Sequence, residues 1–253
     1  MEAVFLGVGE ACDEGLCNTS VLLRERERTG LTLLLDAGFS VPWPFFQEVT
    51  DPDELDGVWI SHFHGDHFLG LPLLLLRFWE SGRSKPLLVL GPPGAQSRIK
   101  QAMGLAYPGL PDKLHFRLDF VELEPGSSGE YLQASWRVEE SDHPRQNLAL
   151  RLQCGARSVY YSGDGRPTRP CAALAEQSDL LIHEAYLAEG EMAGHCSVME
   201  CLGLMESSRA EFLALVHLQR DQRSKASALL EKRASSFGRR RVFLPAPGEV
   251  LSF

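Results

Sequence analysis

The sequence has no hydrophobic run long enough to span a lipid bilayer. Its longest apolar stretch, Phe68 to Trp79, is interrupted by Gly70, Pro72 and Arg77. That stretch is also shorter than the roughly 20 apolar residues that a transmembrane helix needs. The start of the chain has no basic segment followed by an apolar run, so no signal peptide is evident. These absences predict a protein that has no membrane partner.

Closely spaced cysteine pairs are also lacking. The six cysteines form no Cys-x-x-Cys pair, and they are Cys12, Cys17, Cys154, Cys171, Cys196 and Cys201. A chain of 253 residues can bury a sizeable core without disulfide staples. We therefore expect reduced thiols in a cytoplasmic protein.

Positive charge is scarce. Lys and Arg number 25 against 34 Asp and Glu, and the formal net charge is -9. Such a balance argues against broad, non-specific binding of nucleic acid, although it does not exclude a local basic patch. The one basic cluster, Lys232–Arg233 with Arg239–Arg241, is interpreted as a solvated helix end followed by the start of a strand.

Four candidate metal ligands crowd into the segment Ser61–His67. They follow the order His62-x-His64-x-Asp66-His67 and come directly after the apolar, β-branched segment 57–60, which is typical of a buried strand. Such a cluster between a strand and the following helix is a common way for a rigid scaffold to display site residues. Scattered surface histidines or a helix-capping cluster are the alternative interpretation, and the density of ligands disfavours it.

The spacing within this cluster indicates two metal ions. Alternation along an extended chain lets His62 and His64 point the same way. Gly65 then permits a sharp turn that brings Asp66 and His67 to face a second point in space. Imidazole and carboxylate ligands without thiolates suit zinc, with manganese or iron as alternatives.

The order of predicted elements indicates an α/β protein with one domain over residues 1–253. A β-meander over 3–6, 19–24 and 31–36, with a charged loop at 25–30, precedes a loop region punctuated by prolines at 42–53. A helix over 68–79 follows the histidine cluster, and a strand is expected over 85–90. We predict strands at 114–122 and 131–139 on either side of a hairpin-type loop, then a hairpin of strands 147–153 and 158–162. The remaining expectations are helices at 170–177, 197–207 (with a Ser197–Glu200 capping box) and 224–235, and strands at 180–182, 212–216 and, last, 241–244. Many strands followed by strand–helix alternation favours two packed sheets with helices outside.

Three more candidate ligands stand at predicted strand ends. His143 follows the strand ending at Glu139, Asp164 lies between two glycines, and His217 closes the strand 212–216. One such residue alone would more often be a turn carboxylate or a satisfied core histidine. Three of them, each placed like the first cluster, favour one shared site. A carboxylate flanked by glycines suits a ligand that bridges two cations, because small neighbours let both approach it.

With these residues the chain resembles the metallo-β-lactamase superfamily, and within it the ribonuclease Z group. The motif His62-x-His64-x-Asp66-His67 is followed in family order by His143, Asp164 and His217. The stretches 183–185 (His-Glu-Ala) and 194–197 (Gly-His-Cys-Ser) resemble that group's His-Glu-Ala and His-Ser-Thr stretches. The resemblance implies a four-layer αββα sandwich with a dinuclear site at one edge.

The resemblance also implies roles for the site residues. One zinc would be held by His62, His64 and His143, and a second by Asp66, His67 and His217, with Asp164 bridging them. Asp66 would also orient or deprotonate the attacking water, and His195, supported by Glu184, would donate a proton to the leaving oxygen. The alternative interpretation of His195 is a residue preceding the helix cap at Ser197. His183 is expected to be a buried supporting residue and not a ligand. A homodimer is suggested by the resemblance alone.

One departure from the ribonuclease Z pattern bears on the substrate. In that group the flexible arm that grips tRNA lies between the stretches that match His143 and Asp164. Here Asp164 follows His143 by only 21 positions, enough for one hairpin. Without the arm, an acidic chain has little to hold a polyanion. We therefore expect a small phosphodiester as substrate, with RNA as the alternative.

The sequence thus predicts a dizinc phosphodiesterase that uses a metal-bridging hydroxide, since two cations about 3.5–4 Å apart can activate a shared water. Three alternatives stay open. They are a tRNA 3′-processing endoribonuclease that uses another surface such as Arg239–Arg241, an ester, lactone or thioester hydrolase, and a metal-binding scaffold without activity.

Overall fold

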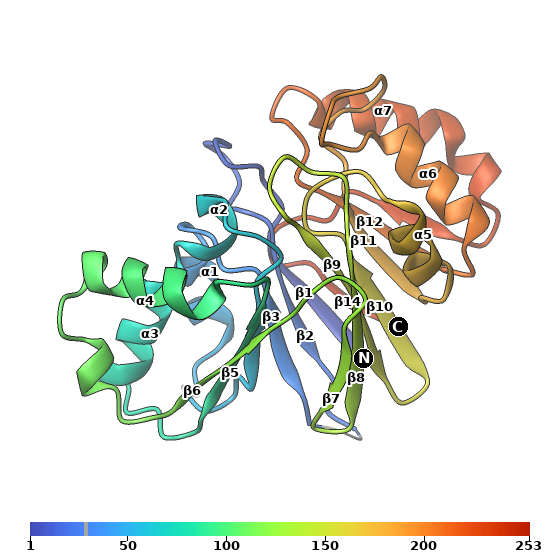
Figure 1. Ribbon diagram of the computed structural model, residues 1–253. Helices are drawn as coiled ribbons and strands as arrows, with labels where there is room; N and C mark the ends of the chain where they lie inside the picture. The colour runs from blue at the N-terminus through green and yellow to red at the C-terminus, as the bar shows by residue number, and fades with distance from the viewer. Residues whose placement is uncertain (28–29) are drawn as a thin grey trace.

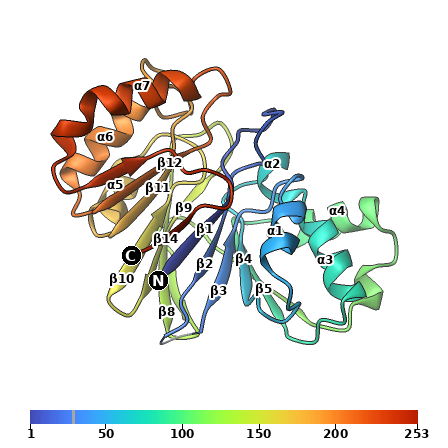
Figure 2. The same ribbon diagram turned by 180° about the vertical axis from the view of Figure 1, so that it is seen from behind.

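The computed structural model describes residues 1–27 and 30–253. Part of the predicted charged loop, residues 28–29, lies outside the described residues. Within the described chain the strands form two sheets of seven, which pack face to face between two layers of helices (Figures 1 and 2). This arrangement confirms the predicted αββα sandwich.

The first sheet combines the N-terminal part of the chain with its last strand. Its strand order is β14 (Val250–Ser252), β1 (Glu2–Gly7), β2 (Ser20–Arg24), β3 (Thr32–Leu35), β4 (Gly57–Trp59), β5 (Leu87–Gly91) and β6 (Leu118–Glu122). Strands β14, β1, β2 and β3 pair antiparallel, and β3 to β6 pair parallel. The outer face carries α1 (Pro42–Glu48), α3 (Leu71–Glu80) and α4 (Ala95–Ala106), while the short α2 (Gly65–Phe68) follows β4, and a 3-10 turn occupies Pro111–Lys113.

The second sheet is built the same way from the rest of the chain. Its strand order is β13 (Arg241–Phe243), β12 (Phe212–Val216), β11 (Leu180–Glu184), β10 (Arg157–Tyr161), β9 (Leu148–Cys154), β8 (Ala134–Glu140) and β7 (Ser128–Tyr131). Strands β7 to β10 pair antiparallel and β10 to β13 pair parallel. The helices α5 (Arg169–Glu176), α6 (Val198–Ser207) and α7 (Arg223–Arg233), with a 3-10 turn at Ala234–Phe237, cover its outer face.

Three apolar layers hold the sandwich together. Because successive residues of a strand point to opposite faces, Phe5 packs between the two sheets while Val4 and Leu6 pack under the helices of the first sheet. Tyr161 and Tyr160 divide the same way in the second sheet. Both faces of each sheet are therefore dry, which explains why the central strands are almost continuous apolar runs.

Several predicted elements differ from the structure. Residues 42–48, expected as loop, form α1, since a proline at the first helical position costs no hydrogen bond. The predicted helix over 68–79 is two helices, interrupted at Gly70, where a Cβ would lie 2.0 Å from the Gly38 carbonyl oxygen. The last predicted strand, β13, is followed by a further one, β14.

The hairpin predicted around residues 125–129 was wrong. Strands β6 and β8 belong to different sheets, and β8 instead pairs with β7, which begins inside the predicted loop. The true turn is Leu132–Gln133, where both residues have positive φ. Non-glycine residues rarely adopt that conformation, so the sequence gives no turn signal there.

Candidate metal centre

The predicted ligands lie at one end of the two sheets, in loops and, for Asp66 and His67, in the short helix α2. His62 and His64 follow β4, and His143 follows β8. Asp164 and His217 follow the parallel strands β10 and β12. Parallel strands end at the same edge of a sheet, and this edge is where α/β proteins commonly place ligand sites. Both halves of the sandwich therefore contribute to one location.

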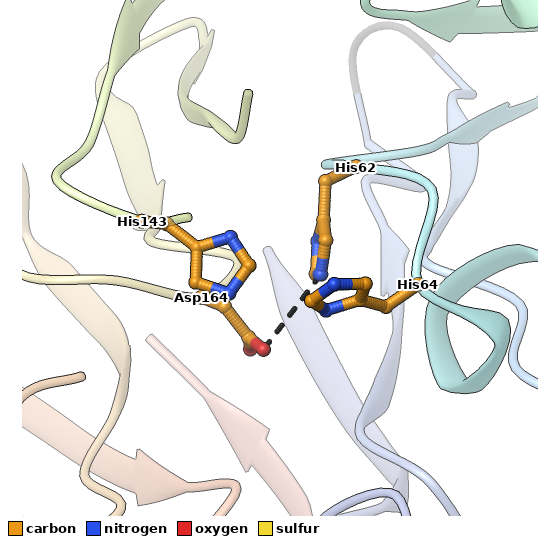
Figure 3. Close-up of side chains that lie close together, drawn as sticks. All are labelled: His62, His64, His143 and Asp164. Carbon is orange, nitrogen blue, oxygen red and sulfur yellow. Dashed lines mark ion pairs between the residues drawn. The ribbon is translucent and has the colours of Figure 1, made fainter. Parts of the chain in front are cut away.

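The first group consists of His62, His64, His143 and Asp164. One ligand atom from each residue lies within 4.8 Å of the others. Figure 3 shows His62 and His64 facing His143 and Asp164 across a shared space, with their polar atoms directed into it. His62 Nε2 is 3.7 Å from Asp164 Oδ2. Three imidazoles and one carboxylate in this arrangement match the donors of a zinc-type site.

The second group consists of Asp66, His67 and His217, which are buried and again lie within 4.8 Å of one another. The Asp66 Oδ2 atom is 3.3 Å from His67 Nε2 and 3.3 Å from His217 Nε2. His217 reaches this point from a backbone with positive φ, and its N–H donates to the Val8 carbonyl at 2.9 Å.

Asp164 connects the two groups. While its Oδ2 is near His62, its Oδ1 is 3.4 Å from His67 Nε2 and 3.6 Å from His217 Nε2. The two oxygens of one carboxylate thus approach ligands of different groups. A bridging carboxylate between two cations needs this geometry.

Buried polar atoms at the centre face one another without forming hydrogen bonds. Among the described residues, His62 Nε2, His67 Nε2 and Asp164 Oδ1 are buried without a hydrogen bond. Leaving such atoms unpaired costs free energy, so a native structure normally explains each one. A pair of divalent cations would satisfy all three, and the residues present therefore fit such ions.

The electrostatics of the centre favour cations. Burial holds the pKa of His62 well below its ordinary value, so the imidazole is neutral and able to ligate. Burial opposes protonation of His217 too, but Asp164 and Asp66 outweigh it and raise its pKa to about 9. For Asp164, burial raises the pKa, yet His217 and His67 hold it well below the usual range. The carboxylates are ionised and stabilise positive charge at the facing nitrogens.

Asp36 orients one of the ligands. Its Oδ2 accepts hydrogen bonds from His67 Nδ1, Ser61 Oγ and Tyr161 OH, all at 2.7 Å, and its Oδ1 accepts from the Ser61 N–H at 2.7 Å. His67 thereby carries its proton on Nδ1 and presents Nε2 to the centre. This role of Asp36 was not predicted from the sequence. The sequence offered one signal for it, a carboxylate directly after the strand β3. That signal was too weak, because the sequence does not show that Asp36 is fully buried.

Asn147 fixes the loop that carries Asp164. Its Oδ1 accepts the Asp164 N–H at 3.1 Å, and its Nδ2 donates to Ser141 Oγ and to the Ser162 carbonyl, both at 2.8 Å. Ser141 Oγ in turn donates to the Asp164 carbonyl at 2.7 Å. Gly163 allows this close packing, because its φ is +58° and a Cβ there would lie 2.3 Å from Asn147 Oδ1. These supporting residues were also missed.

His195 and Glu184 form a pair beside the centre. His195 Nδ1 is 3.2 Å from Glu184 Oε1, and its ring is 5.6 Å from that of His143. Glu184 is fully buried and accepts N–H groups of Gly165, Tyr186 and Cys196 at 2.9–3.0 Å. Burial lowers the pKa of His195, but the hydrogen bond to Glu184 more than offsets this and raises it. The imidazole is therefore positioned with Nε2 available for proton transfer.

His183 lies outside both groups. It is fully buried, and its Nδ1 is 2.8 Å from the Glu184 carbonyl and 3.5 Å from Cys201 Sγ. No disulfide is present among the described residues, and the sulfurs of Cys196 and Cys201 are 3.6 Å apart.

In the described part of the chain, no helix is both long and apolar enough to cross a membrane.

Comparison with known families identifies the chain. The model of the family described as anti-Pycsar protein Apyc1 matches residues 1–241. The chain belongs to this family. The predicted resemblance to the ribonuclease Z group is confirmed alongside it, as the curated relatives show.

The curated relatives carry the name ribonuclease Z. The chain is 28% identical to ribonuclease Z of Methanosarcina acetivorans over 275 residues, covering 86% of this chain and 87% of the relative. It is 25% identical to ribonuclease Z of Shouchella clausii over 293 residues, covering 91% and 93% of the two chains.

Solved structures share the fold. The short form of human tRNase Z (ELAC1) matches with a TM-score of 0.80 and 24% identity over 100% of this chain and 99% of its own. The metallo-β-lactamase fold protein YhfI from Bacillus subtilis matches with a TM-score of 0.80 and 23% identity over 99% and 98%. The curated relatives and the two ligand groups together support a metal-dependent hydrolase of the ribonuclease Z-like kind.

Proposed function

We propose that this family member is a dizinc phosphodiesterase that hydrolyses small phosphodiesters. The observation that carries the proposal is the pair of ligand groups joined by Asp164 with the His195–Glu184 pair beside them. The curated relatives are named for phosphodiester cleavage of RNA, which supports the bond class.

Seven residues would hold the cations. The first would be bound by His62, His64 and His143, the second by Asp66, His67 and His217, and Asp164 would bridge them. When bound, such a pair lowers the pKa of a water molecule and neutralises charge on the phosphoryl oxygens. Mainly imidazole donors favour zinc over magnesium or calcium, with manganese and iron as alternatives.

The chain's own residues then handle protons. Asp66 would orient the attacking water and accept its proton. His195 would donate a proton to the leaving oxygen, because Glu184 accepts from its Nδ1 and leaves Nε2 for the substrate. A protonated donor is the form that the raised pKa of His195 favours.

The structure around the site supports a small substrate. The 20 residues between His143 and Asp164 are occupied mainly by β9 and β10, which are short and paired in the second sheet. Within the described residues, no arm extends from this segment. The basic cluster near the C-terminus is also partly engaged by protein groups and less able to bind RNA. Arg240 donates to the Met205 and Ser208 carbonyls, and Arg241 pairs with Glu249.

The test is metal-dependent turnover of a chromogenic diester. Zinc-loaded protein should hydrolyse bis(p-nitrophenyl) phosphate, and chelation should abolish and zinc restore that activity. Asp66→Asn should lose activity, whereas Asp112→Asn, an exposed aspartate in the Pro111–Lys113 turn, should keep it. If protein shown to contain two metal ions does not hydrolyse the diester, the proposal is overturned. Faster cleavage of carboxylic esters or thioesters, unaffected by His195→Ala, would favour the alternative hydrolase.

tRNA 3′-processing is the second candidate, because the relatives are named ribonuclease Z and the human short tRNase Z shares the fold. Cleavage of a precursor tRNA at its 3′ end at nanomolar enzyme would establish this function. The proposal for a small substrate instead expects the diester to be cleaved much faster than the tRNA at equal enzyme concentration.

A further inference from the structure

A cleft opens beside the first ligand group. It has a volume of about 380 Å³ and is lined by Phe63, His64, Pro93, Arg98, Arg145 and Gln146. We call it the arginine cleft. His64 belongs both to this cleft and to the metal centre, so a molecule bound at the metals can extend directly into the cleft.

Arg98 is held next to the centre by an aromatic ring. Its guanidinium carbon lies 4.9 Å from the centroid of the Phe63 ring, and Phe63 stands between the ligands His62 and His64. This cation–π contact positions the guanidinium but leaves its N–H donors free. Among the described residues, Arg98 has no carboxylate partner.

Arg145 is the second arginine that lines the cleft. Its carbonyl oxygen accepts from Nδ1 of the ligand His143 at 3.0 Å, so its backbone position is coupled to that of the metal centre. Its side chain is exposed and, within the described chain, makes no ion pair. Some other arginines of this acidic protein do have carboxylate partners, as Arg166 does in Glu200 at 2.6 Å.

We propose that the arginine cleft binds a second anionic group of the substrate, carried on the ester substituent that does not leave. This inference rests on the proposed phosphodiesterase function. Two unpaired guanidiniums on one cavity present planar donor forks that match a carboxylate or a phosphate. The preferred substrate class is therefore a phosphodiester with an additional carboxylate or phosphate on its retained group.

Two chromogenic diesters of equal size test this specificity. Both release p-nitrophenol, and the retained group is 4-carboxyphenyl in one and its neutral isostere 4-carbamoylphenyl in the other. The intact protein should prefer the carboxylate diester by roughly tenfold in kcat/KM, as two charge-assisted contacts allow. Arg98→Gln and Arg145→Gln should each reduce this ratio, because each lowers kcat/KM for the carboxylate diester more than for the carbamoyl diester. Arg157→Gln, at the opposite end of β10, should leave the ratio unchanged.

The outcomes separate the two proposals. If neither diester is cleaved by metal-loaded protein, the phosphodiesterase proposal fails. If both are cleaved but the carboxylate diester has no advantage, or if the arginine variants lower both rates equally, the function stands and the anion-binding cleft is wrong. A preference that shrinks as salt is added would further support direct charge recognition.

Discussion

At the scale of single residues, the metal centre depends on side chains that belong to neither ligand group. Asp36 accepts four hydrogen bonds from a fully buried position, and one of them sets the proton position of the ligand His67. A carboxylate there serves as acceptor only. An asparagine at this position would direct its NH2 group at neighbours that are themselves hydrogen-bond donors.

Asp36→Asn should therefore weaken metal binding while the fold persists. We expect about 10–100-fold lower affinity, the usual cost of losing a partner behind a metal-bound histidine. Metal content after dialysis against a buffered zinc series measures this. Tyr161→Phe removes one donor and keeps the carboxylate, so its loss should be much smaller. Equal losses in both variants would contradict the assigned role of Asp36.

His195→Ala should show a dependence on the leaving group. A proton donor matters most when the leaving oxygen is basic, so the variant should lose about 100-fold for a phenyl or alkyl ester and far less for p-nitrophenyl. Rates across a series of leaving groups give the slope of log kcat/KM against the pKa of the leaving group. His115→Ala, an exposed histidine outside the metal groups, is the control. An unchanged slope in the His195 variant would rule out proton donation.

At the scale of elements, the loop after β10 is held by close contacts that only glycine permits. Gly163 has φ +58°, and a Cβ there would lie 2.3 Å from Asn147 Oδ1 and 2.6 Å from Ser61 Cβ. Both of those neighbours belong to the hydrogen-bond network around Asp164 and Asp36. Strain at this glycine would therefore reach both halves of the centre.

Gly163→Ala should lower the melting temperature and the metal affinity together. Gly203→Ala is the matched control, because Gly203 lies in α6 and has no atom within 4 Å of an added Cβ. There the substitution should stabilise by about 0.5–1 kcal/mol through helix propensity and reduced chain entropy. Thermal unfolding of both variants, with and without zinc, makes the comparison. Destabilisation at both positions would contradict the packing argument.

Elements with strong local signals were predictable from the sequence, and the pairing between distant elements was not. The capping box of Ser197 and Glu200 and the apolar segment Phe212–Val216 marked α6 and β12 correctly. The β7–β8 turn at Leu132–Gln133 carries no glycine or asparagine, so its location had to come from the structure. Likewise, nothing local shows that Leu118–Glu122 belongs to the first sheet.

For the site, the residues that the structure brings together were predictable, because metal chemistry favours particular residue types at strand ends. The supporting residues Asn147 and Asp36 were not, since an asparagine or aspartate next to a strand is common and these two are distinguished by their burial. The unpaired state of Arg98 and Arg145 is also a property of three-dimensional neighbours and leaves no trace in the sequence.

At the scale of the whole molecule, the ligands connect the two halves of the sandwich. His62, His64, Asp66 and His67 come from the first sheet's side, and His143, Asp164 and His217 from the second. Ions that bind only the folded chain stabilise it by mass action.

Zinc should therefore raise the melting temperature of metal-free protein. At a free zinc concentration about 100 times the dissociation constant, the gain is about 2.7 kcal/mol for each ion bound. Calorimetry of the apo and loaded protein measures it, and a His64→Ala/His217→Ala double variant should lose most of the gain. A zinc effect of full size in that variant would place the stabilising ions elsewhere.

Because the proposed metal ligands come from both halves of the chain, the protein can be divided into two fragments that each carry part of the centre. A chain cut between β6 and β7 yields a fragment with the histidine cluster and another with the bridging aspartate, and the second also carries the strand β14 that borders β1. Neither piece could assemble a dinuclear centre alone. Catalysis would reappear only on reassembly, so the two fragments could report when proteins fused to them meet.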